Sequence, residues 1–207
     1  HPHIFDLSYF TSNKSCDPMI QQGNVLQCEI SQDCLTGKRG SRQSIEIEYT
    51  QKNEEWISNE LADIIKSCSY PLHFMDFETA SLAIPPHNGM KPYGNIAFQW
   101  SCHTISEPDA KPTHSDWINT ENKFPNVTFA QTLMEQVGFD GSVFMWSKHE
   151  NTTLNDILKI LEETGDNSDP NLTNWLKYIV KTKDDSDYTM IDLSLIHISE
   201  PTRLTSI

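Results

Sequence analysis

The sequence predicts an α/β protein in which a mixed sheet is flanked by helices. One observation is the alternation of large apolar with small or polar side chains over residues 96–103, which is typical of a half-buried strand. Another is the series of helical and short apolar segments after residue 126, which is typical of strands connected through helices. Apolar residues make up 37% of the 207-residue chain, enough to form a core between these layers.

The expected strands are short and bounded by turn-forming residues. Segment 72–78 is apolar enough for the centre of a sheet, and segment 142–146 has the character of a buried parallel strand. Weaker patterns predict strands over 114–118 and 188–192. Polar–apolar alternation predicts one further short strand over 44–49.

Helices are expected where apolar residues recur with a period near 3.6. These helices cover 54–67 and 127–137, begin again at Glu150, and include 172–179. Because three strands precede an alternation of helices and strands, this order predicts a ribonuclease-H-like sheet. In such a sheet the first and fourth strands lie side by side.

The charge and the cysteines limit the class of protein. A formal net charge of -14 argues against a broad basic surface for phosphate backbones. It does not exclude a nuclease, because a carboxylate site is itself acidic until it binds metal. No secretory signal and no membrane-spanning apolar run is evident. We therefore expect a cytoplasmic protein without a membrane partner, whose five cysteines are reduced or bind metal.

Both ends of the chain have features that are unusual for a natural protein terminus. It begins at His1 without an initiator methionine, so we expect this end to be internal to a longer protein. Residues 193–203 resemble a translation of the transposase adapter used for sequencing libraries, and we interpret 193–207 as an artefact. Residues 1–50 and 51–192 are then expected to belong to two domains, the second being C-terminally truncated.

Asp76 and Glu78 lie two residues apart in the first strong strand, so their side chains share one face. Two neighbouring carboxylates beside Phe74, Met75 and Phe77 are costly to bury without compensation. Divalent cations compensate such a pair, and carboxylate oxygens suit Mg²⁺ or Mn²⁺. The alternative is an exposed strand end with two acids and no ligand.

Glu150 follows segment 142–146 and begins the next helix. A carboxylate in the first turn is stabilised by the helix dipole, so one interpretation is purely structural. In the other, Glu150 lies just past the fourth strand and approaches Asp76 and Glu78 on the first. Three carboxylates would then share one cation site.

Several segments together resemble the bacterial domain-of-unknown-function family 2779. The resemblance spans roughly residues 40–193 and is carried by Pro71-Leu72-His73-Phe74-Met75-Asp76-Phe77-Glu78-Thr79, Lys91-Pro92-Tyr93, Phe98-Gln99-Trp100-Ser101-Cys102-His103, Gly141-Ser142-Val143-Phe144, Lys148-His149-Glu150 and Ile191-Asp192-Leu193.

This resemblance implies a ribonuclease-H-like nuclease of the DEDD 3′–5′ exonuclease type, acting on DNA or RNA. Asp76 and Glu78 match the first exonuclease motif, and Glu150 matches the acid of the second. The implied mechanism uses two Mg²⁺ or Mn²⁺ ions about 3.5–4 Å apart.

The sequence also departs from the implied pattern. Many relatives have Asn shortly before the acid of the second motif, whereas this chain has Trp146 or Ser147 there. Asp192 matches the family's Asp-Leu pair, either as a further metal ligand or as a structural residue. A fourth acid and a general base would lie beyond the artefactual segment, so the fragment is expected to be inactive.

Cys16, Cys28 and Cys34 resemble the tail of the iron–sulfur-bearing, nuclease-like region that precedes such domains. A [4Fe–4S] cluster needs four thiolates, so one would lie upstream. Zinc is the alternative occupant, and unligated reduced thiols are the structural alternative. Cys68 ends an expected helix and Cys102 faces the expected core, so neither is a candidate.

His73 and the tryptophans are interpreted as structural. His73 lies on the face opposite Phe74 and is expected to pack there rather than act as a base. Tryptophans can form a platform for stacking bases. The chain has five tryptophans: Trp56, Trp100, Trp117, Trp146 and Trp175. Most of them fall at apolar periodic positions, so we expect tryptophans in the core rather than in such a platform.

Three functions therefore compete. The first is a metal-dependent nuclease. The second is a noncatalytic module that binds nucleic acid or protein through a degenerate ribonuclease-H-like fold. The third is a purely structural domain of a larger DNA-processing protein. Convergence of Asp76, Glu78 and Glu150 favours the first, and a Glu150 that points away favours the second. The oligomeric state is not predicted.

Overall fold

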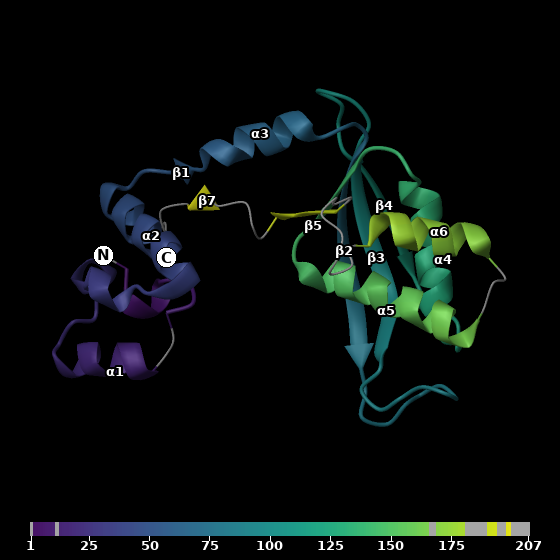
Figure 1. Cartoon of the computed structure of the whole chain (residues 1–207), viewed down its shortest axis with the longest axis horizontal. Helices are drawn as coiled ribbons and strands as arrows, with labels where there is room; N and C mark the ends of the chain where they lie inside the picture. Colours follow the sequence, from purple (N-terminus) through teal and green to yellow (C-terminus); the bar gives the residue numbers. More distant parts are fainter. Residues whose placement is uncertain (1, 11–12, 166–168, 181–189, 194–197, 200–207) are drawn as a thin grey trace. The chain divides into compact units, whose positions relative to one another are not determined.

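The computed structural model describes residues 2–10, 13–165, 169–180, 190–193 and 198–199, drawn in colour in Figure 1. The chain divides into two compact units. One comprises His1–Ile64 with Ile196–Ile207, and the other comprises Ile65–Leu195. Helix α2 (Gly40–Lys52) runs through residue 50, near which the sequence places a domain boundary. The domain ranges given above stay a prediction.

The first unit is mostly helical and has its own apolar core. Its elements are η1 (Ile4–Asp6), α1 (Asn13–Gln21), η2 (Gln27–Glu29), η3 (Gln32–Cys34), η4 (Gly37–Arg39), α2, β1 (Trp56–Ile57) and β7 (Ile198–Ser199). Helix α3 (Asn59–Ser67) follows β1 and runs into the second unit. The buried residues of the first unit include Ile4, Leu7, Phe10, Cys16, Met19, Ile30 and Ile47.

The strand predicted over 44–49 is wrong, because these residues lie inside α2. The short alternating pattern also fits a helix: Gln43 and Ile47 are four residues apart and both are buried on one face. Glu46 and Glu48 are good helix formers. The helix ends at Asn53, which adopts a left-handed conformation with φ of 55°.

The helix predicted over 54–67 begins later than expected. Residues Trp56–Ile57 form β1, and α3 begins at Asn59. Strand β1 pairs in antiparallel fashion with β7, which lies within the 193–207 segment.

The second unit is built on a five-stranded mixed sheet with the strand order β4-β3-β2-β5-β6. The strands are β2 (Leu72–Ser81), β3 (Asn95–Ile105), β4 (Thr113–Ile118), β5 (Ser142–Met145) and β6 (Met190–Asp192). Strands β2, β3 and β4 are antiparallel, whereas β2, β5 and β6 are parallel. The predicted α/β class is therefore confirmed, as is the prediction that the first and fourth strands are neighbours.

Three helices cover one face of this sheet: α4 (Asn126–Val137), α5 (Lys148–Thr164) and α6 (Pro170–Ile179) (Figure 1). They pack with Met75 and Phe77 of β2 and with Val143 and Met145 of β5 in one core. Because side chains alternate along a strand, the residues between these point the other way. We call this other side the open face; it carries Phe74, Asp76, Glu78, Ser101, His103 and Phe144.

The start of β5 is fixed against the start of β2. The backbone N–H of Ser142 donates to the Pro71 carbonyl over 3.0 Å, and the Ser142 hydroxyl accepts from the Ser69 N–H over 2.9 Å. Gly141 has a φ of +86°, and a Cβ there would collide with the Pro71 carbonyl. Only glycine satisfies both conditions, so Gly141 sets the approach of the two strands.

Within the described part of the chain, no helix has the length and apolar character needed to cross a bilayer.

Candidate functional site

Asp76 and Glu78 lie on the open face of β2, as their spacing predicts. Asp76 is opposite Ser101 and Glu78 is opposite Gln99 on β3. Both acids are exposed, because their apolar neighbours Met75 and Phe77 point into the core on the other side. The two carboxylates therefore face solvent, and the expectation that they need a cation to compensate for burial is wrong. Asp76 follows directly after the last β2 residue that pairs with β5.

A register shift between β2 and β3 follows Glu78. Thr79 pairs with Ala97, so one residue of β3 is skipped. Such bulges bend a strand and redirect its side chains. The Thr79 hydroxyl lies 3.2 Å from Nε2 of His149 in the first turn of α5. Because Thr79 pairs with the core residue Ala97, this contact places the start of α5 against the face of β2 opposite to the one that carries Asp76 and Glu78.

Glu150 is the third residue of α5 and takes part in a capping box. Its Oε2 accepts a hydrogen bond from the Ser147 N–H over 3.2 Å, and the Ser147 hydroxyl accepts from the His149 N–H over 3.2 Å. The side chain is only 3% exposed. The structural role considered for Glu150 is therefore present.

The surroundings of Glu150 shift the pKa of its carboxyl group. Burial raises the pKa of the Glu150 carboxyl, and the charge of Asp76 raises it further. The N–H groups of Glu150 and Ser147 and the nearby His149 oppose this rise. Asp76 therefore belongs to the charged surroundings of Glu150, while a cation site shared by all three carboxylates stays a prediction. No comparable interaction joins Glu150 to Glu78 in the described structure.

The acids do not converge into a ready-made metal centre. Among the described residues, no three His, Cys, Asp or Glu side chains gather in a group that could hold a metal ion. Asp192 is buried and in register with Met145, so it lies on the helix-covered face rather than with Asp76. The arrangement therefore offers one exposed carboxylate pair, with Glu150 close to one member.

The three candidate cysteines occupy different environments. Cys16 is 2% exposed, packs in the core of the first unit and donates to the Phe10 carbonyl over 3.4 Å. Cys28 and Cys34 are exposed in the short turns η2 and η3. Burial raises the pKa of the Cys16 thiol, as does the neighbouring Asp17, whereas a metal ligand must be a thiolate. An iron–sulfur or zinc site on these cysteines stays a prediction.

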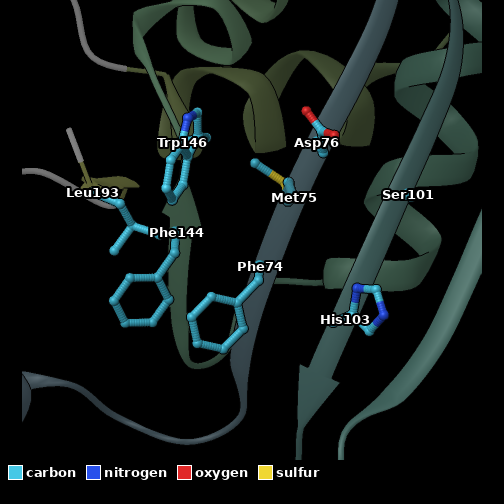
Figure 2. A pocket seen from close by; sticks show the side chains of 8 residues that line it. All are labelled: Phe74, Met75, Asp76, Ser101, His103, Phe144, Trp146 and Leu193. Atoms are coloured by element: carbon cyan, nitrogen blue, oxygen red, sulfur yellow. The ribbon is translucent and has the colours of Figure 1, made fainter. Parts of the chain in front are cut away.

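A hollow of about 500 Å³ opens beside Asp76 on the open face. Figure 2 shows Asp76 and Trp146 on opposite sides of it, with Phe74, Phe144 and His103 farther down the strands. The rings of Phe74 and Phe144 stack with their centroids 4.7 Å apart and their planes tilted by 9°. Asp76 is thus shared by the carboxylate pair and by an aromatic pocket.

Comparison with known families places this geometry in context. Residues 73–200 match the family model described as a domain of unknown function, DUF2779, which is more than half of the chain. The chain belongs to the DUF2779 family. No curated protein and no solved structure matches it. The resemblance inferred from the sequence is therefore confirmed at the level of the family.

The DUF2779 match includes all four candidate acids and excludes the three candidate cysteines. It also extends over the first part of the 193–203 segment, so the adapter interpretation stays a prediction. The candidate site therefore lies within the DUF2779 domain itself.

Two residues of the DUF2779 domain near the acids were missed as functional candidates. The prediction that tryptophans are buried holds for Trp100 and Trp175, but Trp146 is 72% exposed at the end of β5. Continuing the alternation of β5 past Phe144 would have placed Trp146 on the open face. His149, which contacts Thr79, had no sequence signal beyond its position before Glu150. His73 is buried, as predicted.

Proposed function

We propose that this DUF2779 domain is the catalytic part of a metal-dependent nuclease of the DEDD 3′–5′ exonuclease type. The observation that carries the proposal is the exposed pair Asp76 and Glu78, side by side on the open face of the central strand. Glu150, which is electrostatically coupled to Asp76, supports the proposal from the neighbouring helix.

The strand order supports the same proposal. The order β4-β3-β2-β5-β6, with β2 parallel to β5, is the arrangement expected of a ribonuclease-H-like sheet. Asp76 lies where β5 ends, beside the loop that leads into α5. Ligands of open α/β sheets commonly bind at the carboxyl ends of the parallel strands.

Mg²⁺ or Mn²⁺ is the cation class that fits these donors. Mg²⁺ often keeps several waters and is held by one or two carboxylates together with substrate phosphates, which is what Asp76 and Glu78 offer. Bound cations of this kind activate water and stabilise the departing oxygen of a phosphodiester. Since Oε2 of Glu150 accepts the Ser147 N–H, Glu150 would add a third carboxylate through its other oxygen.

The chain's own groups have two roles in this proposal. Asp76 and Glu78 bind the cation, and their acidity keeps phosphate away until a cation is present. Glu150 holds the start of α5 through its cap and repels Asp76 in the absence of a cation. A divalent cation would relieve this repulsion, so the pair is prepared for a positive charge.

A second function is favoured by one specific observation. Since no three of the described acids or other ligand side chains form a group, the domain also fits a noncatalytic module that binds nucleic acid or protein. In that case Asp76 and Glu78 are surface acids and Glu150 is only a helix cap.

The two functions are separated by measuring nucleotide release from labelled single-stranded DNA and RNA in Mn²⁺. The assay uses a longer DUF2779 protein that contains residues 51–192 and continues beyond them, because the fragment alone is expected to be inactive. Asp76→Asn is expected to abolish release and to leave the melting temperature equal or higher, because it removes the repulsion with Glu150.

The matched control is Asp116→Asn. Asp116 is also an exposed acid, but it lies on β4, where it pairs with Ser101 of β3. This variant should retain full nucleotide release. Equal release by wild type and Asp76→Asn would remove the catalytic assignment and leave the interaction module.

A further inference from the structure

Trp146 has a large apolar ring that is exposed to solvent. It is 72% exposed, whereas Trp100 is 4% and Trp175 is 0% exposed in the core. Its position directly after β5 places it beside Leu193 and above Phe144, at the rim of the hollow (Figure 2). An exposed tryptophan at the edge of an apolar pocket is a common anchor for a flat ligand.

The hollow has an aromatic wall and few polar groups. Phe74, Phe144 and Trp146 supply the aromatic wall, and Ser101, His103 and Asp76 supply the polar atoms. None of the described residues that line it is Lys or Arg. The pocket itself therefore suits an uncharged planar ring rather than a phosphate group.

We infer that this hollow binds an unpaired nucleobase stacked on Trp146, from a single-stranded nucleic acid whose backbone passes Asp76 and Glu78. This inference rests on the proposed function and names the substrate class of that site. Asp76 links the two parts, because it belongs both to the carboxylate pair and to the wall of the hollow.

The requirement for a single strand follows from stacking. In a duplex, neighbouring bases already cover both faces of a base, so Trp146 could reach only a base that is unpaired or flipped out. Aromatic side chains hold successive bases of single strands in this way, without sequence preference. A volume of about 500 Å³ leaves room for one base and its sugar.

The charge of the chain also indicates that the base and the phosphate are bound by different interactions. The chain carries a net charge of -14, and Asp76 lies at the hollow, so phosphates are repelled unless a cation is bound. The base must then supply attraction that does not depend on charge. Stacking on Trp146 is such an attraction, and a metal at the carboxylate pair would supply the attraction for the phosphate.

The test measures the binding of two probes to the full chain in Mn²⁺ by fluorescence anisotropy. One probe is a single-stranded, phosphorothioate-linked oligonucleotide of about ten nucleotides, and the other is an abasic strand of the same length and charge. Wild type should prefer the strand that has bases and should bind its duplex form more weakly.

Trp146→Ala should weaken binding of the base-containing strand about 5- to 100-fold and leave abasic binding unchanged. Trp146→Tyr should retain most of the preference. Tyr93→Ala is the matched control, since Tyr93 is 70% exposed and does not line the hollow, and it should bind like wild type. Circular dichroism of each variant confirms folding.

The outcomes separate this inference from the proposed function. The inference would be overturned if Trp146→Ala bound each probe as tightly as wild type does. It would also be overturned if wild type did not bind the base-containing strand. Whether Asp76 binds Mn²⁺ is measured separately and does not depend on either result. A base preference that persists in EDTA and in Asp76→Asn supports the inference while it counts against the metal-dependent nuclease.

Discussion

At the scale of single residues, Glu150 has two opposing environments. Its carboxyl group is nearly buried and faces the charge of Asp76, which favours the protonated form. It also accepts a hydrogen bond from the Ser147 N–H at the positive end of α5, which favours the ionised form. Burial has the larger effect, and the pKa is raised. Ionised Glu150 therefore costs folding free energy at neutral pH.

Glu150→Gln is expected to stabilise the chain at pH 7 by up to about 1 kcal/mol, the size of a typical single-residue effect. Glutamine keeps an oxygen for the Ser147 N–H, so the capping box survives. Because the folded-state pKa lies above the unfolded one, the wild-type penalty vanishes below the unfolded pKa and grows as pH rises through the folded value.

Urea unfolding of both proteins at several pH values between 4 and 8 measures this difference. The two curves should coincide at the acidic end and separate towards neutral pH. A glutamine variant that is less stable at pH 7 would contradict the assigned balance of burial and capping.

His73 gives the opposite pH dependence. It is buried, its Nδ1 lies 3.0 Å from the Thr104 hydroxyl, and its Nε2 has no hydrogen-bond partner among the described residues. Burial lowers the pKa of His73. The folded state thus holds the neutral ring, and stability is lost as pH falls below the unfolded value of about 6.5, by at most about 1.4 kcal/mol per pH unit.

Replacing this ring by His73→Phe should flatten the loss of stability between pH 7 and pH 5, because phenylalanine has a similar size and does not titrate. The free energy of unfolding at each pH checks this expectation, with His87→Phe as the control for a histidine that is not buried. Parallel pH curves for wild type and His73→Phe would show that His73 does not cause the loss.

At the scale of elements, sequence patterns predicted strands correctly where one face of the strand is buried. Residues 96–103 alternate because Trp100 and Cys102 enter the core while Ser101 and His103 do not, and the structure has β3 there. The pattern failed over 44–49, where it was too short to exclude the helical spacing of α2.

The pairing of β5 with β2 depends on Gly141. Gly141→Ala should destabilise the chain by on the order of 2 kcal/mol or more, since it combines a positive φ with a collision against the Pro71 carbonyl. Gly165→Ala is the matched control. Gly165 has a φ of +62° but open space around a Cβ, so its cost should be about 1 kcal/mol.

Thermal melts of the two glycine variants measure both costs. Equal losses would mean that only the backbone conformation matters and that the contact with Pro71 does not set the strand approach.

At the scale of the whole molecule, the order of strand and helix patterns predicted the fold class but did not show which distant side chains lie close together. The shared face of Asp76 and Glu78 follows from strand geometry alone and was predictable. The bulge at Thr79, the capping contact of Glu150 and the opposite face of Asp192 depend on tertiary packing, which spacing does not encode. The exposure of Trp146 was not predicted, because it belongs to an apolar run and such a run predicts burial for all its residues. The run does not show that β5 ends before Trp146.

The central claim is that Asp76 and Glu78 together hold a divalent cation on the open face. The most direct measurement is a calorimetric titration of the full chain with Mn²⁺, compared with the Asp76→Asn/Glu78→Gln double variant and with Asp116→Asn. The account predicts binding by wild type and Asp116→Asn. It predicts affinity at least about 10-fold weaker in the double variant, because loss of even an outer-shell partner of a metal typically costs about 10- to 100-fold. Equal Mn²⁺ affinity in all three proteins would contradict it.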